Sequence, residues 1–173
     1  MSSRQSHPRA GMVEELADRA AIGDLLLRYF RAMDRHDMDL ARACFADEAR
    51  LSYGDAFDGD PNAFVAWVSS PEVLGGVERT MHFAGNTLIE FDGDVAYSEV
   101  YALAQHTAKA GHRWEGAFVT MWLRYIDRLE RRDDGWRIVH REAITEWVRK
   151  DTAGMWEEVD SSSRRDRQDP VYR

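Results

Sequence analysis

The chain has 173 residues, 44% of them hydrophobic and 31% charged, a composition typical of a globular protein with a substantial core. Its net charge of −8 argues against nucleic acid as a partner, because contacts with phosphates need a basic face. No run of about 18 apolar residues is present, so we expect no membrane-spanning helix and no membrane partner. Cys44 is the only cysteine, which excludes an intramolecular disulfide and a multi-cysteine zinc site.

Composition divides the chain into three segments. Residues 1–11 are polar and lack the apolar centre of a signal peptide, so we expect a flexible N-terminal arm on a cytoplasmic protein. Residues 12–150 carry regular hydrophobic periodicity and are expected to form one domain. Residues 151–173 are polar and are expected to form a C-terminal tail that wraps a surface or a neighbouring subunit.

Three helices are predicted in the first part of the chain. Apolar side chains recur at helical spacing from Val13 to Arg35, which predicts a first helix of several turns. A shorter helix follows with Asp37 as its N-cap, and a third begins with Asp60 as N-cap and Pro61 at its first position. The segment "ARLSYG" predicts a short strand between the second and third helices.

The second part of the chain has the period-two pattern of long strands. Past the Gly75–Gly76 loop, four such segments are separated by "DGD", "KAGHRWEG" and "DDG", which predict hairpin turns. Helices followed by a run of hairpins indicate an α+β fold. We expect a curved, cone-shaped sheet, mixed or antiparallel, with the N-terminal helices covering one face and a cavity inside.

One acid interrupts the apolar stripe of the first helix. Ile22, Leu26 and Phe30 recur every four residues, and Asp34 takes the next place on the same face. A buried carboxylate is costly unless a partner binds it, and His82, in the otherwise apolar or small segment "MHFAGN", is the simplest partner. Asp34 would accept the Nδ1–H of this histidine, fix its tautomer and leave Nε2 free as a base.

A second histidine, His106, ends a stripe of small side chains on the next strand, which the hairpin places beside His82. Tyr29, at the edge of the Asp34 face, and Tyr53, at the end of the first strand, could each donate a hydrogen bond to a substrate oxygen, or could each line a cavity rim. We expect the substrate pocket to be completed by apolar and amide side chains, namely Phe30, Met33, Trp67, Asn86, Ala104, Phe118 and Met121.

Four segments together resemble the SnoaL-like branch of the nuclear transport factor 2-like superfamily. They are "DRAAIGDLLLRYFRAMDRHDMDLARACFADEA", "MHFAGN", "FDGDVAYSEVYALAQH" and "RYIDRLERRDDGWRIVHR", in the order of the family and covering residues 13–150. The branch includes scytalone dehydratase, hexachlorocyclohexane dehydrochlorinase, bile-acid dehydratase and polyketide cyclases. The resemblance implies a cone-shaped α+β barrel with a deep hydrophobic pocket and neither a metal nor an organic cofactor.

The resemblance also implies roles for individual residues. It places the catalytic dyad on Asp34 and His82, the second histidine of scytalone dehydratase on His106, and its helix and strand tyrosines on Tyr29 and Tyr53. Bile-acid dehydratases have an acid near Ala104 and an arginine near Thr145, and neither is present here, which argues against a bile-acid substrate. Members of the branch form trimers or dimers, so we expect a homo-oligomer packed through the convex sheet face, with large side chains at Tyr97, Tyr101 and Trp122.

Two classes of function fit these residues. The first is a cofactor-independent lyase of the dehydratase type, acting on a small hydrophobic aromatic or cyclic substrate. The same site could instead run a retro-aldol C–C cleavage, such as loss of formaldehyde from a diol, or an isomerisation or cyclisation. The second class is a non-catalytic protein that binds small molecules or resembles a dioxygenase β subunit, but such a protein has no need for an acid on a buried stripe.

A metal site is not predicted. His106 and His112 flank a turn and His36 adjoins Asp37, but none of these pairs has the spacing of a metal-binding motif. We expect His36 and His112 to be exposed loop residues.

Overall fold

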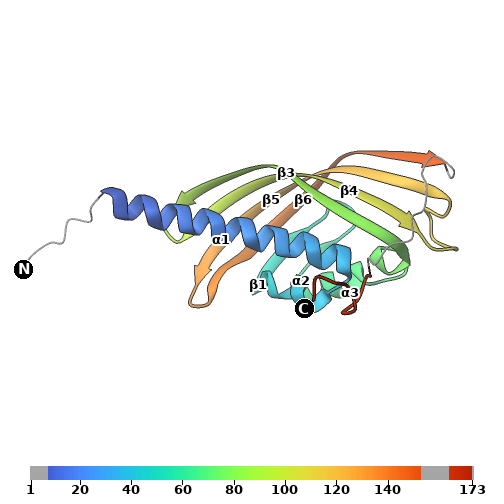
Figure 1. Ribbon diagram of the computed structural model, residues 1–173, viewed down its shortest axis with the longest axis horizontal. Coiled ribbons are helices and arrows are strands. Elements are labelled where there is room, and N and C mark those ends of the chain that lie inside the picture. Colours follow the sequence, from blue (N-terminus) through green and yellow to red (C-terminus); the bar gives the residue numbers. More distant parts are fainter. Residues whose placement is uncertain (1–7, 153–163, 173) are drawn as a thin grey trace, which may run out of the picture.

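The computed structural model describes residues 8–152 and 164–172. Its elements follow the order α1 (Pro8–Arg35), α2 (Met38–Ala43), β1 (Phe45–Ser52), β2 (Asp58–Gly59), α3 (Pro61–Val68), a 3-10 turn (Leu74–Gly76), β3 (Val77–Asp92), β4 (Val95–Ala108), β5 (Ala117–Arg132) and β6 (Gly135–Thr152). The expected α+β class is confirmed, with helices first and long hairpin-connected strands after them (Figure 1).

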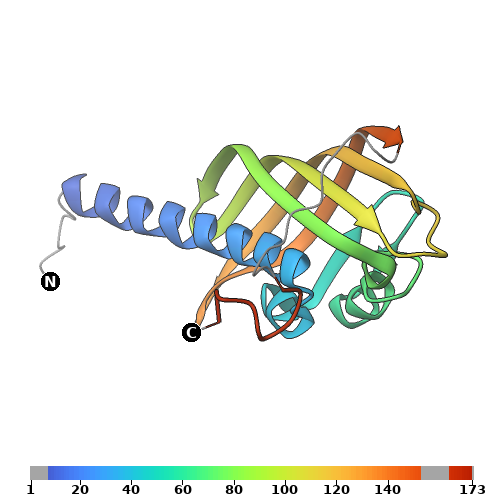
Figure 2. The same cartoon turned by 45° about the vertical axis from the view of Figure 1, so that its right-hand side comes forward.

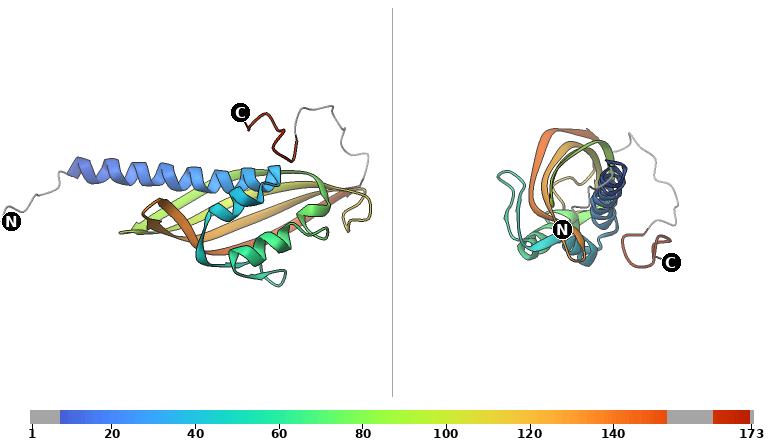
Figure 3. Two further views of the ribbon diagram at one scale, coloured as in Figure 1. Left: turned by 90° about the horizontal axis from the view of Figure 1, so that it is seen from below. Right: turned by 90° about the vertical axis from the view of Figure 1, so that its left-hand side faces the viewer.

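The six strands form one mixed sheet in the order β2-β1-β6-β5-β4-β3. Only β1 and β6 pair in parallel, while the hairpins β3–β4, β4–β5 and β5–β6 are antiparallel. The long strands curve together around one side of the molecule, and α1 lies across the open side of that curve (Figures 2 and 3). This arrangement is the cone that the sequence predicted, with α1 as its cover.

The predicted helix starts agree with the structure at two N-caps. The Asp37 carboxylate accepts a hydrogen bond from the backbone N–H of Leu40 at 3.2 Å, which caps α2. The Asp60 carboxylate accepts the N–H groups of Asn62 and Ala63 at 2.8 and 3.0 Å, with Pro61 in the first helical position. Both caps satisfy backbone donors that the first helical turn leaves free.

The N-terminal boundary was predicted wrongly in part. Helix α1 begins at Pro8, so residues 8–11 belong to a helix and not to the expected flexible arm, whose remaining residues 1–7 lie outside the described part of the chain. Proline is favourable in a first helical turn because its missing N–H has no helical partner there. The first turns of α1 extend beyond the sheet (Figure 1), and Val13 and Leu16 are accordingly exposed.

The strand predictions need two corrections. Strand β1 begins at Phe45, four residues before the predicted segment, because it pairs in parallel with β6 from Phe45 opposite Ile138. The two-residue strand β2 was not predicted. It pairs with the end of β1, where Leu51 faces Gly59, and so extends the sheet past that strand.

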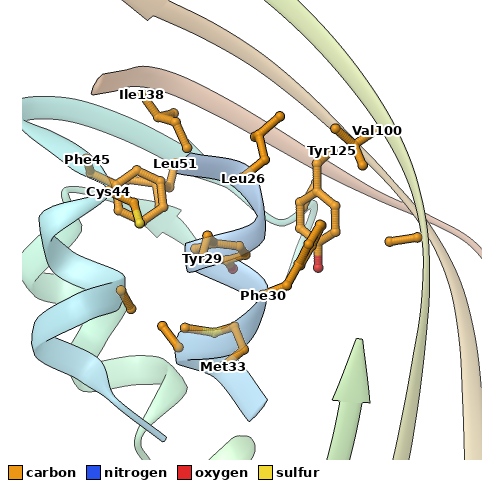
Figure 4. Packing of buried hydrophobic residues seen from close by; sticks show 14 of the residues in the cluster. Leu26, Tyr29, Phe30, Met33, Cys44, Phe45, Leu51, Val100, Tyr125 and Ile138 are labelled. Atoms are coloured by element: carbon orange, nitrogen blue, oxygen red, sulfur yellow. The ribbon is translucent and has the colours of Figure 1, made fainter. Parts of the chain in front are cut away.

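The core lies between α1 and the concave face of the sheet. Ile22, Leu26 and Phe30 of α1 are buried, and Figure 4 shows Phe30 beside Tyr125 of the sheet, with 5.4 Å between their ring centroids. On β4 the small-residue stripe faces inward as predicted, because its alternate positions are all buried: Ala96, Ser98, Val100, Ala102, Ala104 and His106. None of the described helices is long and apolar enough to cross a bilayer.

Candidate active site

Asp34 and His82 form a hydrogen-bonded pair inside the cone. His82 Nδ1 lies 2.7 Å from Asp34 Oδ1, and the backbone N–H of His82 donates to both carboxylate oxygens at 3.0 Å. The side chain of His82 is only 6% exposed and that of Asp34 only 11%. Because a carboxylate can only accept hydrogen bonds, Nδ1 carries the proton in this arrangement and Nε2 is left as the basic nitrogen.

Two aromatic rings orient His82. Phe30, one turn before Asp34 on α1, stacks on the imidazole with 5.8 Å between ring centroids and an angle of 12° between the planes. His106 contacts it edge-on at 5.9 Å from β4. Residue 82 lies directly opposite Ala104 in the β3–β4 ladder, and this small side chain leaves room for the imidazole.

His106 is buried beside the pair and stays uncharged at neutral pH. It is 4% exposed and stacks on Trp114 with 5.3 Å between centroids. Burial, helped by His82 when that imidazole is protonated and by the charge of Arg165, lowers the pKa of His106 to about 3. A neutral imidazole can donate one hydrogen bond, but it is not the charged acid that an imidazolium would be.

Tyr29 and Tyr53 meet at their hydroxyl groups, which lie 2.7 Å apart. Burial raises the pKa of both phenols, so both remain protonated at neutral pH. One of the two O–H groups is used in the bond between them, which leaves the other free to donate. Trp67 packs against the Tyr53 ring at 5.6 Å and joins an aromatic cluster with Phe57.

The structure separates the predicted pocket residues into two groups. Phe30, Met33 and Ala104 are buried on the inner side, and Met121 lies beside Ala104 on β5. Asn86 instead lies on the outer face of the sheet.

A bulge explains the position of Asn86. The β3–β4 register shifts between Ala84 and Thr87, so the alternation that would place Asn86 on the same face as His82 is broken. Phe118 is four residues before Trp122 and by strand alternation shares its outer face. These two residues are therefore not brought to the dyad.

A buried ion pair that the sequence did not reveal joins β5 and β6 on the inner face of the sheet. Arg141 and Asp127 are 0% and 1% exposed, and the guanidinium donates to both carboxylate oxygens at 2.7 and 2.6 Å. The same guanidinium lies over the rings of Tyr29 and Tyr125, at 4.1 and 4.8 Å from their centroids. Burial acts to lower the pKa of Arg141, but the Asp127 carboxylate outweighs it and keeps the pKa above the usual value.

A bulge in β6 explains why strand alternation did not predict this pair. Asp127 faces Arg141, and Leu129 faces Ile138, so β6 holds one extra residue at Val139. Alternation from Ile138 would have placed His140 inside and Arg141 outside, whereas the structure buries the arginine and exposes the histidine. On β5, strand alternation places Asp127 on the same inner face as Tyr125. This alternation is the one sequence signal that could have identified a buried acid there.

The histidines considered for a metal site lie elsewhere or are partnered otherwise. His112 is 8% exposed, contrary to the expectation of an exposed loop residue, because its Nδ1 accepts the N–H of Trp114 and its Nε2 donates to the carbonyl of Glu72. His36 is half-buried after α1, in the left-handed region with φ of 53°. Within residues 8–152 and 164–172, no three His, Cys, Asp or Glu side chains are grouped as metal ligands.

Neither of two well-defined hollows among the described residues has Asp34 or His82 in its lining. One is a groove of about 560 Å³ on the outer sheet face, lined by Phe83, Tyr101, Trp122 and Trp147 among others. The other, of about 380 Å³, lies between the end of α1 and the C-terminal segment. The deep pocket at the dyad and the homo-oligomer packed through Tyr97, Tyr101 and Trp122 therefore remain predictions.

Comparisons with known proteins agree with the fold. A family model described as a SnoaL-like domain matches residues 14–142. A hexachlorocyclohexane dehydrochlorinase, LinA type 2, superposes with a TM-score of 0.74 at 18% identity, over 85% of this chain and 97% of that one. A candidate scytalone dehydratase from Novosphingobium aromaticivorans gives 0.68 at 20% identity, over 83% and 97%.

A third similar structure, hexachlorocyclohexane dehydrochlorinase LinA type 3 from Novosphingobium barchaimii, gives a TM-score of 0.72 at 17% identity, over 86% of this chain and 99% of that one. At these identities the likeness establishes the shared fold. No curated protein matches the chain in sequence.

Proposed function

Because the chain belongs to the SnoaL-like domain family, we propose that it is a cofactor-independent lyase that removes a proton from a small hydrophobic aromatic or cyclic substrate. The observation that supports this most is the buried Asp34–His82 pair, with its 2.7 Å bond between Oδ1 and Nδ1. A structural subunit gains nothing from burying a carboxylate against an imidazole, since burial of the acid costs free energy that only its hydrogen bonds offset. An acid–base enzyme needs that arrangement.

In the proposed reaction, His82 Nε2 takes a proton from the carbon next to a carbonyl or another electron sink. The electron pair of the broken C–H bond forms the new double bond, and the C–O bond to the leaving hydroxyl breaks. The imidazolium formed on His82 is stabilised by Asp34, and its proton passes to the leaving hydroxyl, which departs as water. A positioned base of this kind typically contributes about 10²–10⁴-fold to the rate.

The remaining polar groups supply hydrogen bonds in this proposal. The free O–H of the Tyr29–Tyr53 pair donates to the oxygen on which negative charge develops. His106, which is neutral, donates to the leaving hydroxyl. We assign it the role of a neutral donor and not of a charged acid, because its pKa of about 3 leaves the imidazole uncharged at neutral pH.

The test is turnover of a panel of aromatic hydroxy-ketones and diols by the wild type and by Asp34→Asn and His82→Gln. Mass spectrometry of the products separates dehydration, which loses water, from retro-aldol cleavage, which releases formaldehyde, and from isomerisation or cyclisation, which leaves the mass unchanged. We expect dehydration, with kcat/KM lowered about 10²–10⁴-fold in both variants.

Matched controls are available on the same elements. Asp24→Asn changes an exposed acid of α1, and His140→Gln changes an exposed histidine of the sheet, and both are expected to retain full activity. Far-ultraviolet circular dichroism and thermal unfolding establish that each variant is folded. If both dyad variants keep most of the activity, the dyad is not the catalytic site. If no substrate of the panel turns over but several bind, a non-catalytic binding protein is the better description.

A further inference from the structure

Three buried polar atoms beside the dyad have no hydrogen-bond partner within the described part of the chain. They are Thr80 Oγ1, His106 Nδ1 and Arg165 Nε. Thr80 lies directly opposite His106 in the β3–β4 ladder and two residues before His82. Thr80, His106 and His82 therefore share one face of the sheet. Buried polar groups in proteins are nearly always paired, and such exceptions at a concave face indicate a place for a ligand group.

The third of these atoms comes from a distant part of the chain. Residues 164–172 pack against the end of α1 and the start of α2, where Arg35 pairs with Asp169 at 3.1 Å and the Tyr172 hydroxyl donates to Asp37 at 2.7 Å. This is the part of the tail expected to wrap a surface, and it contacts its own chain.

The docked segment places Arg165 at the start of β3. The guanidinium donates through its Nη atoms to the backbone carbonyls of Leu74 and Val77, three residues before Thr80. These two acceptors fix the plane of the side chain while Nε–H stays buried and unused. An arginine is always protonated and carries donors only, so the unused N–H calls for an acceptor.

The charge of Arg165 reaches the dyad. Burial lowers the pKa of Arg165, and the negative charge of Asp34 opposes that shift. The positive charge of Arg165 is in turn among the causes that lower the pKa of His106. A buried cation whose Nε–H has no acceptor among the described residues favours a bound anion. The Asp34 carboxylate opposes such an anion, but it already accepts three hydrogen bonds from His82.

We propose that Thr80, His106 and Arg165 form a polar subsite that binds an anionic oxygen of the substrate, such as a carboxylate or a phenolate. The Thr80 hydroxyl and Arg165 Nε–H donate to this oxygen, and His106 donates to it in the tautomer that protonates Nδ1. For such a substrate the single N–H of His106 serves this oxygen, and the leaving hydroxyl takes its proton from His82 without help from His106. The inference rests on the proposed function, because the subsite is defined by its position beside the base His82. It narrows the substrate class from apolar rings to aromatic or cyclic compounds that carry an acidic group.

The experiment compares benzoate with benzamide, which have nearly the same shape but differ in charge, by isothermal titration calorimetry on the full-length protein. Hydrogen bonds to charged groups contribute about 1.5–3 kcal/mol, so we expect benzoate to bind about 10- to 100-fold more tightly. Arg165→Gln should remove most of this preference and Arg165→Lys should retain part of it. Thr80→Val, which keeps the shape of the side chain, should weaken benzoate alone.

The matched control is Arg167→Gln, two residues along the same segment, whose side chain is 69% exposed and pairs with Asp37. It is expected to leave both affinities unchanged, and thermal unfolding establishes that each variant is folded. Equal affinity for the two ligands, no binding of benzoate, or an unchanged preference in Arg165→Gln overturns the proposal. Because binding needs no turnover, an inactive protein that still prefers benzoate keeps the subsite and loses only the proposed lyase function.

Discussion

Replacement of Arg141 by Met tests whether the buried Arg141–Asp127 ion pair is costly to break. The substitution removes two charge-assisted hydrogen bonds, of 2.7 and 2.6 Å, and leaves the Asp127 carboxylate buried without its cation. Breaking a buried pair in this way costs about 3–5 kcal/mol. A protein of this size is stable by about 5–15 kcal/mol, so the loss is a large fraction of the total.

The measurement is the free energy of unfolding in urea at neutral pH, supported by the melting temperature. For a chain of this length, 1 kcal/mol corresponds to about 2–4 °C, so we expect the melting temperature to fall by about 6–20 °C. The double variant Arg141→Met/Asp127→Leu removes both charges together and should recover most of the loss, because apolar side chains of similar volume need no partner.

A surface ion pair provides the control. Arg149 and Asp151 also lie within 2.9 Å of each other, but the arginine is 64% exposed, and Arg149→Met should cost at most about 1 kcal/mol. The reasoning is refuted if Arg141→Met costs no more than this surface variant, or if the double variant is as unstable as Arg141→Met alone. Either result would mean that burial does not make the pair costly to break.

Two further outcomes follow from buried titratable groups. The pKa of His106 is about 3 in the folded chain and near 6.5 in the unfolded chain, so on acidification the unfolded chain binds the proton first. The free energy of unfolding is therefore at its full value above about pH 6.5. It falls with decreasing pH by up to about 1.4 kcal/mol per pH unit. Urea unfolding between pH 7 and pH 4 should show this slope, and it should be shallower in His106→Gln; equal slopes would contradict it. Burial also raises the pKa of the Cys44 thiol to about 11, so the folded protein should not react with a thiol reagent at pH 8, whereas the urea-unfolded chain should react at once; fast labelling of the folded protein would disprove this.

The dyad could be predicted from the sequence because both of its elements are regular up to the residues concerned. Helix α1 keeps its period from Ile22 to Asp34 without a break, so counting in fours identifies the acid that points inward. The caps Asp37 and Asp60 were predictable for the same reason, since an N-cap depends on a few adjacent residues. On the sheet, alternation found His106 because β4 has no bulge before it where it pairs with β5.

Bulges and distant chain segments account for what the sequence did not reveal. One extra residue in β3 moves Asn86 to the outer face, and one in β6 brings Arg141 to the inner face. Gly85 lies inside the β3 bulge and is a residue type that often marks one, whereas the β6 bulge at Val139 contains neither glycine nor proline. Arg165 could not be found by periodicity at all, because its position depends on how residues 164–172 dock onto α1 and α2. Local pattern has no information about such tertiary contacts.

The double backbone contact of Asp34 has a consequence for how this site can change over time. The main chain of β3 holds the carboxylate through the amide of residue 82, whatever side chain that residue carries. A mutation of the histidine therefore removes the proposed base without releasing the carboxylate from its position. Descendants of this chain could lose the imidazole, persist as binding proteins with the acid still in place, and regain a base at the same position in a single substitution.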